Sequence, residues 1–211
     1  MKIQFLESVD STQTHLKNLL KNRQVSSPYA IVSKIQTDGL GSRDNSWIGY
    51  EGNLFLSFSI NLQDLPNDLK LESASIYFAY ILKETLSELG SKAWLKWPND
   101  FYLDDLKIGG MITTVVDTNL ICGVGLNLVK NPDGFGKIDI SISIVELLNN
   151  YFTNIKRNDL WKQVFSKYKL EFYLNQKFFT HKNNLRISLD EAALQSDGSI
   201  ISNNERIYSL R

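Results

Sequence analysis

Two apolar segments that carry glycines, residues 107–116 and 120–129, constrain the fold of this chain most strongly. They flank a short polar turn at residues 117–119, and their apolar content predicts a β-hairpin in the middle of a sheet. The glycines of the two arms are Gly109, Gly110, Gly123 and Gly125. Because glycine weakens a strand, glycines at neighbouring sheet positions indicate that another group approaches the backbone closely, and we expect a ligand. The alternative is that they relieve packing against a long helix.

The remaining hydrophobic pattern mixes strands and helices without regular strand–helix–strand alternation. A short helix is expected after the capping residues Asp10 and Ser11, a long helix over residues 71–89, and further helical segments from residue 143. Strands are expected at residues 29–36, 53–60 and 92–97, and the tail, residues 178–211, is expected to form short strands. This organisation predicts the α+β class and not a doubly wound parallel sheet.

The composition argues against several classes of function. Of the 211 residues, 43% are hydrophobic, which is typical of a folded globular domain. Lysine plus arginine and aspartate plus glutamate each number 23, so the net charge is zero and a basic nucleic-acid-binding protein is not expected. One cysteine and two histidines argue against a cysteine-rich or histidine-rich metal site. Neither a signal peptide nor a membrane-length apolar run is evident, so we expect a cytoplasmic protein.

The polar loop at residues 37–47 is a second candidate for a ligand contact. Gly39 and Gly41 allow close approach to the backbone and offer amide N–H groups to an anion. Arg43 adds a positive charge, and Trp47 adds an apolar face. The loop matches neither the Walker pattern nor the dinucleotide-binding pattern. The alternative is a surface loop with turn glycines.

The third candidate is the sequence Lys-Trp-Pro-Asn-Asp at residues 96–100. Pro98 is expected to end a strand, because proline is poorly tolerated within a central strand. Trp97 would then place a stacking surface beside Asn99 and Asp100. The alternative is ordinary turn chemistry at a strand end.

Lys107 and Asn127 are expected to face the space beside the hairpin glycines. Lys107 would be a cation for a carboxylate or a phosphate, and Asn127 would be a hydrogen-bonding group, unless Lys107 is simply a solvated lysine. The sequence carries no motif of a nucleophilic hydrolase or a zinc protease. The pattern therefore favours activation of a carboxylate by a nucleoside triphosphate, in which positioning and charge neutralisation supply most of the catalysis.

Taken together in this order, the segments resemble the biotin protein ligases, also called biotin–[acetyl-CoA-carboxylase] ligases. The matching segments are residues 7–12, 36–47, 96–100, 107–112 and 123–127. The resemblance implies a catalytic domain at residues 1–174, with helices packed on a mixed or antiparallel central sheet as in lipoate ligases and class II aminoacyl-tRNA synthetases. It also implies a small, truncated SH3-like β domain at residues 175–211.

The resemblance further implies an ATP-dependent enzyme that works in two steps. Biotin and Mg-ATP form biotinyl-5′-AMP, and a lysine on the biotin carboxyl carrier protein of acetyl-CoA carboxylase, or of another biotin-dependent carboxylase, then receives the biotinyl group. Lys107 and Arg43 are implied as catalytic residues. The implied biotin-binding residues are Ser11, Thr12, Gln36, Gly39, Leu40, Trp47, Lys107, Gly110, Gly123 and Gly125. The implied nucleotide-binding residues are Arg43, Asn99, Asp100, Asn127 and Phe135, and Asp100 is also the candidate ligand for Mg²⁺.

The glycine-rich loop departs from the family pattern, because Leu40, Ser42 and Asn45 stand where arginines are common. Either Arg43 takes over the phosphate contacts, or ATP and the adenylate are held more weakly.

The chain begins at the expected catalytic domain, so we expect no N-terminal DNA-binding domain and neither a nucleic-acid nor a membrane partner. A monomer and a homodimer both remain open. Two rival functions are a lipoate or octanoyl ligase or transferase of the same superfamily, and a non-catalytic sensor that binds biotin or a nucleotide.

Overall fold

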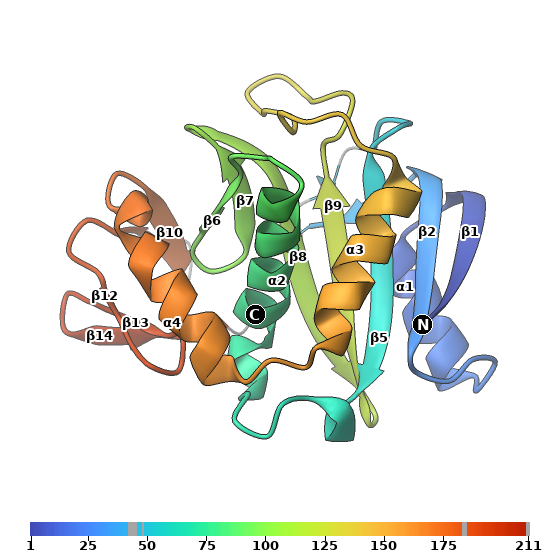
Figure 1. Ribbon diagram of the computed structural model, residues 1–211, viewed down its shortest axis with the longest axis horizontal. Coiled ribbons are helices and arrows are strands. Elements are labelled where there is room, and N and C mark those ends of the chain that lie inside the picture. Colours follow the sequence, from blue (N-terminus) through green and yellow to red (C-terminus); the bar gives the residue numbers. More distant parts are fainter. Residues whose placement is uncertain (42–45, 48, 183–184, 210–211) are drawn as a thin grey trace.

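A seven-stranded mixed sheet forms the centre of the protein, and the computed structural model describes residues 1–41, 46–47, 49–182 and 185–209. In spatial order the strands are β1 (Lys2–Val9), β2 (Tyr29–Gln36), β5 (Leu54–Asn61), β9 (Asn119–Leu126), β8 (Leu106–Val116), β7 (Asp100–Leu103) and β6 (Trp94–Lys96). β1 and β2 pair in parallel, whereas the other neighbouring pairs of this sheet are antiparallel (Figure 1). The predicted α+β class with a mixed sheet is confirmed.

Helices cover both faces of the sheet. They are α1 (Thr12–Lys21), α2 (Ala74–Glu88), α3 (Ile144–Lys156) and, beside the C-terminal region, α4 (Trp161–Glu171). α2 and α3 lie on one face and α1 on the other (Figure 1). On β2, Ala30 and Val32 pack in the larger core with α2 and α3, whereas Ile31 packs in a smaller core with Leu16 of α1. This division follows from the alternation of side chains along a strand. No helix in the described part of the chain is both long and apolar enough to cross a bilayer.

The predicted hairpin is confirmed, since β8 and β9 pair with Gly110 opposite Gly125 and Ile112 opposite Gly123. The loop predicted after β2 contains a short strand pair, β3 (Gly39–Leu40) and β4 (Ser46–Trp47). Strands β1 and β7 were not predicted. β1 is an edge strand without a fully buried residue, so its sequence lacks a clear hydrophobic alternation. β7 is short and directly follows turn-forming residues, so its sequence was interpreted as part of a turn.

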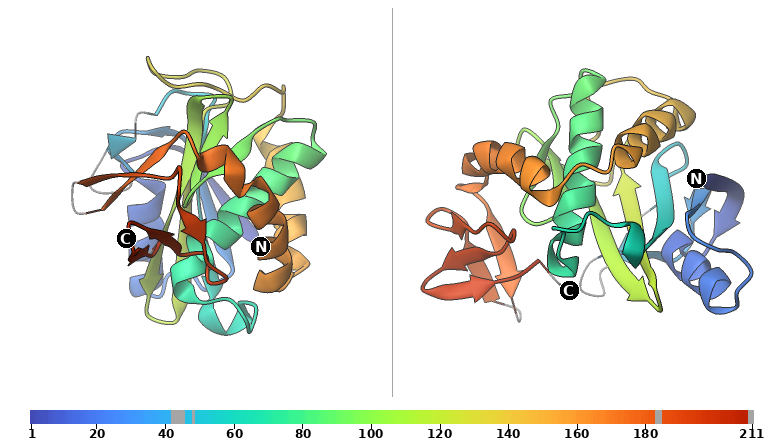
Figure 2. Two further views of the ribbon diagram at one scale, coloured as in Figure 1. Left: turned by 90° about the vertical axis from the view of Figure 1, so that its left-hand side faces the viewer. Right: turned by 60° about the horizontal axis from the view of Figure 1, so that its bottom comes forward.

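The C-terminal residues form two small sheets beside α4, as predicted for a tail of short strands (Figure 2). One sheet pairs β10 (Phe179–Lys182) with β11 (Leu185–Ser188). The other sheet contains β12 (Ala193–Leu194), β13 (Ile200–Ser202) and β14 (Glu205–Ile207). Short 3-10 turns occur at Leu62–Asp64, Leu71–Ser73 and Phe172–Asn175. The turn at Leu71–Ser73 occupies the start of the helix predicted over residues 71–89.

Trp97 does not form the predicted stacking surface. Its side chain is 1% exposed, and its indole N–H donates to the carbonyl of Gly198 at 2.8 Å. Its backbone N–H donates to Oδ1 of Asn175 at 2.7 Å. The prediction was wrong because segments far along the chain cover this strand end, which local sequence does not reveal. Trp97 thereby ties the C-terminal region to the central sheet.

Candidate active site

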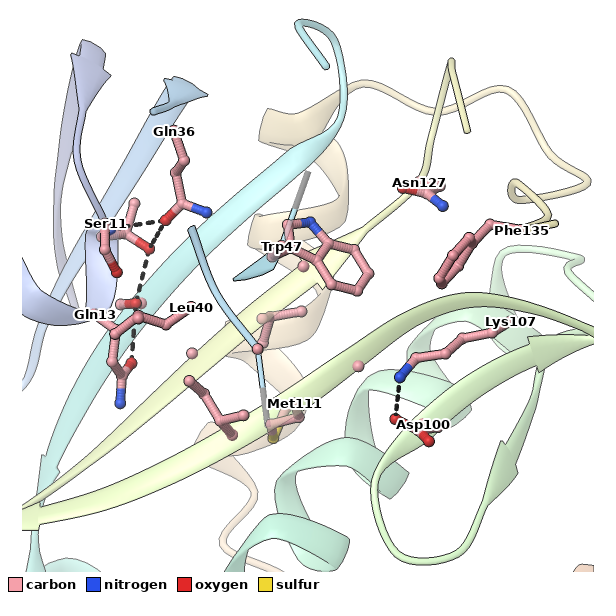
Figure 3. Close-up of a pocket in the computed structure, with 18 of the residues that line it drawn as sticks. Ser11, Gln13, Gln36, Leu40, Trp47, Asp100, Lys107, Met111, Asn127 and Phe135 are labelled. Carbon is pink, nitrogen blue, oxygen red and sulfur yellow. Dashed lines mark hydrogen bonds and ion pairs between the residues drawn. The ribbon is translucent and has the colours of Figure 1, made fainter. Parts of the chain in front are cut away.

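A cavity of about 330 Å³ lies on the α1 face of the central sheet (Figure 3). The start of α1, the β3–β4 pair, the glycines of β8 and β9 and the loop after β9 form its walls. The predicted site residues that line it are Ser11, Thr12, Gln36, Leu40, Trp47, Asp100, Lys107, Gly110, Gly123, Gly125, Asn127 and Phe135. The fold therefore brings together residues from widely separated parts of the sequence.

Two predicted residues of the glycine-rich loop are not among the described residues that line the cavity. Arg43 lies outside the described residues, as do Ser42 and Asn45, so the consequence of the missing loop arginines stays a prediction. Gly39 is buried in β3, where a Cβ would lie 2.6 Å from the carbonyl oxygen of Trp47. Gly39 therefore permits β3 to pair closely with β4, which in turn positions the indole of Trp47.

Asn99 also does not line the cavity, although we predicted a nucleotide contact for it. It is buried, and its Nδ2 donates to the carbonyl of Met111 at 2.5 Å. Its own carbonyl accepts the Met111 backbone N–H at 2.9 Å. Asn99 thus fastens the turn between β6 and β7 to β8, since its buried amide and its backbone both bond to Met111.

The first turn of α1 forms the polar end of the cavity. Ser11 is the N-cap of this helix, and its Oγ accepts the Thr14 backbone N–H at 3.4 Å. Thr12 donates to Oε1 of Gln36 twice, from its backbone N–H at 2.7 Å and from Oγ1 at 2.9 Å. Oγ1 of Thr12 also lies 2.9 Å from Oγ of Ser57. The helix start therefore presents several hydrogen-bonding groups to one small space.

Gln13 and Ser57 extend this polar end, and sequence reasoning missed both. Gln13 is 7% exposed, Ser57 is fully buried, and Ser57 Oγ donates to Gln13 Oε1 at 3.1 Å. The sequence signal that could have revealed Ser57 was a serine within the apolar strand β5, on the face opposite Leu56 and Phe58. A buried serine on a strand commonly needs a polar partner from another element.

The glycines of β9 form the floor of the cavity. A Cβ on Gly123 would lie 2.5 Å from Gln13 Oε1, and a Cβ on Gly125 would lie 2.5 Å from Cε2 of Trp47. A Cβ on Gly109 would lie 2.6 Å from the carbonyl oxygen of Gly125. The nearest atoms to these glycines belong to cavity-lining side chains and the neighbouring strand, and the expected ligand stays a prediction.

Lys107 and Asp100 form an ion pair at the end of the cavity away from α1 (Figure 3). Nζ of Lys107 lies 2.6 Å from Oδ1 of Asp100, and Nζ of Lys96 lies 3.6 Å from Oδ2 of the same carboxylate. The side chain of Lys107 is 28% exposed and lines the cavity. A Cβ on Gly110 would lie 3.3 Å from Asp100 Oδ1, so glycine leaves room for the pair.

The described residues do not fit a magnesium ion held by the protein alone. They contain no group of three or more His, Cys, Asp or Glu side chains that could hold a metal. Asp100, the predicted ligand, already faces the ammonium groups of Lys107 and Lys96. Mg²⁺ in nucleotide sites is commonly bound by one or two carboxylates together with substrate phosphates. A magnesium ion here would therefore need oxygen ligands from a bound substrate in addition to the protein.

Asn127 and Phe135 line the cavity on the side of the loop that follows β9. Nδ2 of Asn127 donates to the carbonyl of Gly136 at 2.9 Å, which closes the loop onto its own start. Asn53, which was not predicted, is fully buried and holds the same loop. Its Oδ1 accepts the backbone N–H groups of residues 128, 129 and 130 at 3.1, 3.0 and 3.2 Å. Its Nδ2 donates to the carbonyl of Lys130 at 2.6 Å.

Comparison with solved structures identifies close structural relatives. The biotin acetyl coenzyme A carboxylase synthetase of Helicobacter pylori with bound biotinylated ATP is 38% identical, with a TM-score of 0.94 over 98% of this chain and 99% of that one. The biotin protein ligase of Aquifex aeolicus in complex with biotin and ATP is 23% identical, with a TM-score of 0.79 over 100% of this chain and 96% of that one. The second likeness supports the fold alone.

Comparison of the sequences points the same way. The bifunctional ligase/repressor BirA of Escherichia coli is 28% identical over 130 residues, which are 58% of this chain and 39% of BirA. Biotin–protein ligase 2 of Arabidopsis thaliana is 34% identical over 107 residues, 46% of this chain and 32% of that protein. These matches span only about two fifths or less of the relatives' length.

The sequence model of the biotin/lipoate A/B protein ligase family matches residues 5–131. The chain therefore belongs to the biotin/lipoate A/B protein ligase family.

Proposed function

We propose that this protein is an ATP-dependent biotin protein ligase that attaches biotin to a lysine of a biotin carboxyl carrier domain. The carrying observation is the order of groups along the cavity: hydrogen-bonding groups at Thr12 and Gln36, an apolar floor at Gly123 and Gly125, and the ammonium of Lys107 (Figure 3). Biotin has a polar ureido ring, an apolar thioether ring with its alkyl chain, and a carboxylate in the same order. The biotinylated ATP bound by the Helicobacter pylori relative supports this assignment.

In the first step, an oxygen of the biotin carboxylate forms a bond to the α-phosphorus of ATP. The bond from that phosphorus to the oxygen bridging to the β-phosphate breaks, and pyrophosphate leaves. The reaction brings two anions together, so a cation at their meeting point stabilises the transition state more than the separate reactants. Lys107 supplies this cation, and its ion pair with Asp100 at 2.6 Å holds the ammonium in place beforehand.

In the second step, the neutral amine of the carrier lysine attacks the acyl carbon of biotinyl-5′-AMP. An amide bond forms, the bond from the acyl carbon to the phosphate oxygen breaks, AMP leaves, and the amine proton passes to solvent. Lys107 again neutralises the leaving phosphate. We propose that Asn127 and Phe135 bind the nucleotide, Phe135 by stacking on the adenine and Asn127 by hydrogen bonding.

The polar end of the cavity favours biotin over lipoate as the acid. Lipoate carries a disulfide ring without a hydrogen-bonding group, so it would cover Thr12, Gln36 and Ser57 without offering them partners. Leaving a buried polar group unpaired costs about 1–3 kcal/mol, and each 1.4 kcal/mol is a tenfold change in affinity. We therefore expect strong rejection of lipoate.

The direct test is the intact mass of the biotin carboxyl carrier domain of acetyl-CoA carboxylase after incubation with this protein, biotin and Mg-ATP. We expect a mass gain of one biotinyl group that requires ATP. A parallel reaction contains lipoate and a lipoyl domain and should show no gain. Modification of the lipoyl domain would refute the proposed substrate. No modification of either carrier would refute the proposed activity.

A further inference from the structure

We propose that Lys96 is a positioning residue of this site, whose buried ammonium group holds the carboxylate of Asp100 and preserves a net positive charge beside the reacting phosphate. The inference rests on the proposed function and extends it to a residue behind the cavity wall. Lys96 is 7% exposed and is not among the described residues that line the cavity. It therefore acts on the substrates through Asp100 and Lys107 and not by direct contact.

The ammonium group of Lys96 is charged and yet almost inaccessible to water. Its side chain is 9% exposed, against 28% for the side chain of Lys107. Removing an ammonium group from water is costly, and apolar side chains of similar size often replace a buried ion pair without loss of stability. The stability of the fold therefore does not by itself account for a lysine at this position. We infer that its charge serves the neighbouring site.

Strand pairing places Lys96 on the face of the sheet that carries the cavity. In the antiparallel pair of β6 and β7, Lys96 lies opposite Asp100, and Leu95 lies opposite Phe101. Leu95 and Phe101 are buried in the larger core, so Lys96 and Asp100 point to the other face. Nζ of Lys96 lies 3.6 Å from Oδ2 of Asp100 and 5.7 Å from the ring centre of Tyr102. The carboxylate and the aromatic ring both favour a cation between them.

A β-bulge in β8 brings Lys107 onto the same face. Gly109 pairs with Phe101, whereas Lys107 pairs with Tyr102, so Ile108 is an extra residue between them. With regular pairing, Ile108 would lie opposite Tyr102 and face the cavity, and Lys107 would face the core. Ile108 is instead fully buried in the larger core. The bulge therefore turns Lys107 toward the carboxylate that Lys96 already contacts.

The three side chains form a cluster of two positive charges and one negative charge. Lys107 and Asp100 alone would sum to zero, because the carboxylate that holds the ammonium group also offsets its charge. Lys96 contacts Oδ2 of Asp100 and Lys107 contacts Oδ1, so each carboxylate oxygen has a cation of its own. This arrangement fixes the orientation of the carboxylate and leaves one net positive charge. That charge stabilises a transition state in which a carboxylate meets a polyphosphate.

The test compares Lys96→Met with Lys162→Met, the same substitution at an exposed position of α4. Single-turnover release of pyrophosphate measures adenylate formation, calorimetry measures the Kd for biotin, and thermal unfolding measures stability. We expect Lys96→Met to slow pyrophosphate release about tenfold, a smaller effect than removal of a directly contacting cation. Its Kd for biotin and its Tm should stay at the wild-type values. Lys96→Arg keeps the charge and should restore most of the rate, and Lys162→Met should match the wild type throughout.

A double-mutant cycle tests whether Lys96 acts through Asp100. In a protein that carries Asp100→Asn, the carboxylate that Lys96 holds and offsets is absent. Adding Lys96→Met to this protein should therefore change pyrophosphate release much less than it does in the wild type. An equal slowing in both proteins would overturn the role of Lys96 as a residue that acts through Asp100.

The remaining outcomes separate this inference from the proposed function. Wild-type pyrophosphate release in Lys96→Met would overturn the inference and leave the proposed function intact. A parallel loss of rate, biotin affinity and melting temperature would show a purely structural role and would also overturn it. Lys96→Gln replaces Lys96→Met if the latter does not fold, and failure of both to fold would assign Lys96 to the fold alone. A wild-type protein that releases no pyrophosphate with biotin and Mg-ATP would overturn the proposed function itself.

Discussion

The indole of Trp47 lies against Gly125 of β9 so closely that a Cβ on this glycine would stand 2.5 Å from Cε2 of the ring. Two residues earlier on the same face of the strand, Gly123 gives the same room to Gln13. Nε1 of Trp47, like Nε2 of Gln13, is buried without a partner in the part of the chain that the structure describes. Because glycine has no side chain, the side chains of Trp47 and Gln13 can pack directly against the backbone of β9 and form the walls of the cavity.

We expect Gly125→Ala to displace Trp47 and to weaken biotin binding about tenfold. The added methyl group overlaps the ring, and overpacking of this kind costs about 1–3 kcal/mol. Calorimetric titration with biotin and thermal unfolding measure the two effects. Thr114→Ala, at an exposed position of β8, is the control for a small substitution in the same hairpin. Wild-type affinity in Gly125→Ala would show that Trp47 does not shape the biotin site.

Lys107→Gln should slow adenylate formation about 10²–10³-fold, the range found when a group that stabilises transition-state charge is removed. Biotin affinity should change much less, because the ammonium acts mainly on the charge that develops during reaction. Single-turnover release of pyrophosphate, set beside biotin titration, separates the two quantities. Lys34→Gln removes an exposed lysine that pairs with Glu7 and should have no effect on either. Unchanged pyrophosphate release in Lys107→Gln would contradict its catalytic role.

Asn53→Ala should loosen the loop after β9 and raise the KM for ATP, with a smaller effect on biotin binding. The substitution removes three accepted backbone hydrogen bonds and one donated to Lys130. We expect a loss of about 2–4 kcal/mol in the free energy of unfolding, since several buried groups lose their partner together. Urea unfolding and steady-state kinetics with varied ATP provide the measurements. Equal increases in the KM for ATP and in the Kd for biotin would indicate a general structural defect.

Acid should destabilise the protein partly through Asp197 and Asp139. Burial alone would raise the pKa of each carboxyl group, but hydrogen bonds from Ser199 and Arg206 to Asp197, and from Ser91 and Lys92 to Asp139, lower the pKa below its ordinary value. A lowered folded-state pKa means that the stabilisation is present at neutral pH. This stabilisation begins to be lost as the pH falls below the unfolded-state pKa of about 4. The loss is complete once the pH has fallen through the lower folded-state pKa.

The measurement for this prediction is the urea midpoint between pH 6 and pH 2.5. Asp197→Asn and Asp139→Asn should each be less stable than the wild type at pH 6 and should lose less stability on acidification. Asp190→Asn, at an exposed position, serves as the matched control. Parallel pH profiles for all four proteins would show that these carboxylates do not contribute.

Local sequence pattern predicted those elements that carry a dense or regularly spaced set of apolar residues. β2 and the β8–β9 hairpin follow from apolar runs and turn residues, β5 follows from its alternation of apolar and polar residues, and α1 follows from its Ser11 cap and leucine spacing. β1 escaped because an edge strand buries too little to impose a pattern. Hydrophobic periodicity arises because one face of an element is buried, so an element that buries little shows no clear pattern.

The sequence by itself determined the sheet hairpin, the glycine positions and the segments that mark the family, because each is a short pattern within one stretch of chain. Only the tertiary structure decided that Asp100 pairs with Lys107, that Trp97 is buried beneath Gly198, and that Gln13 and Ser57 join the Thr12–Gln36 network. These contacts depend on strand order and register, which bring together residues far apart in the chain. A hydrogen bond or an ion pair needs its two atoms within about 3–4 Å, and local periodicity cannot specify that distance.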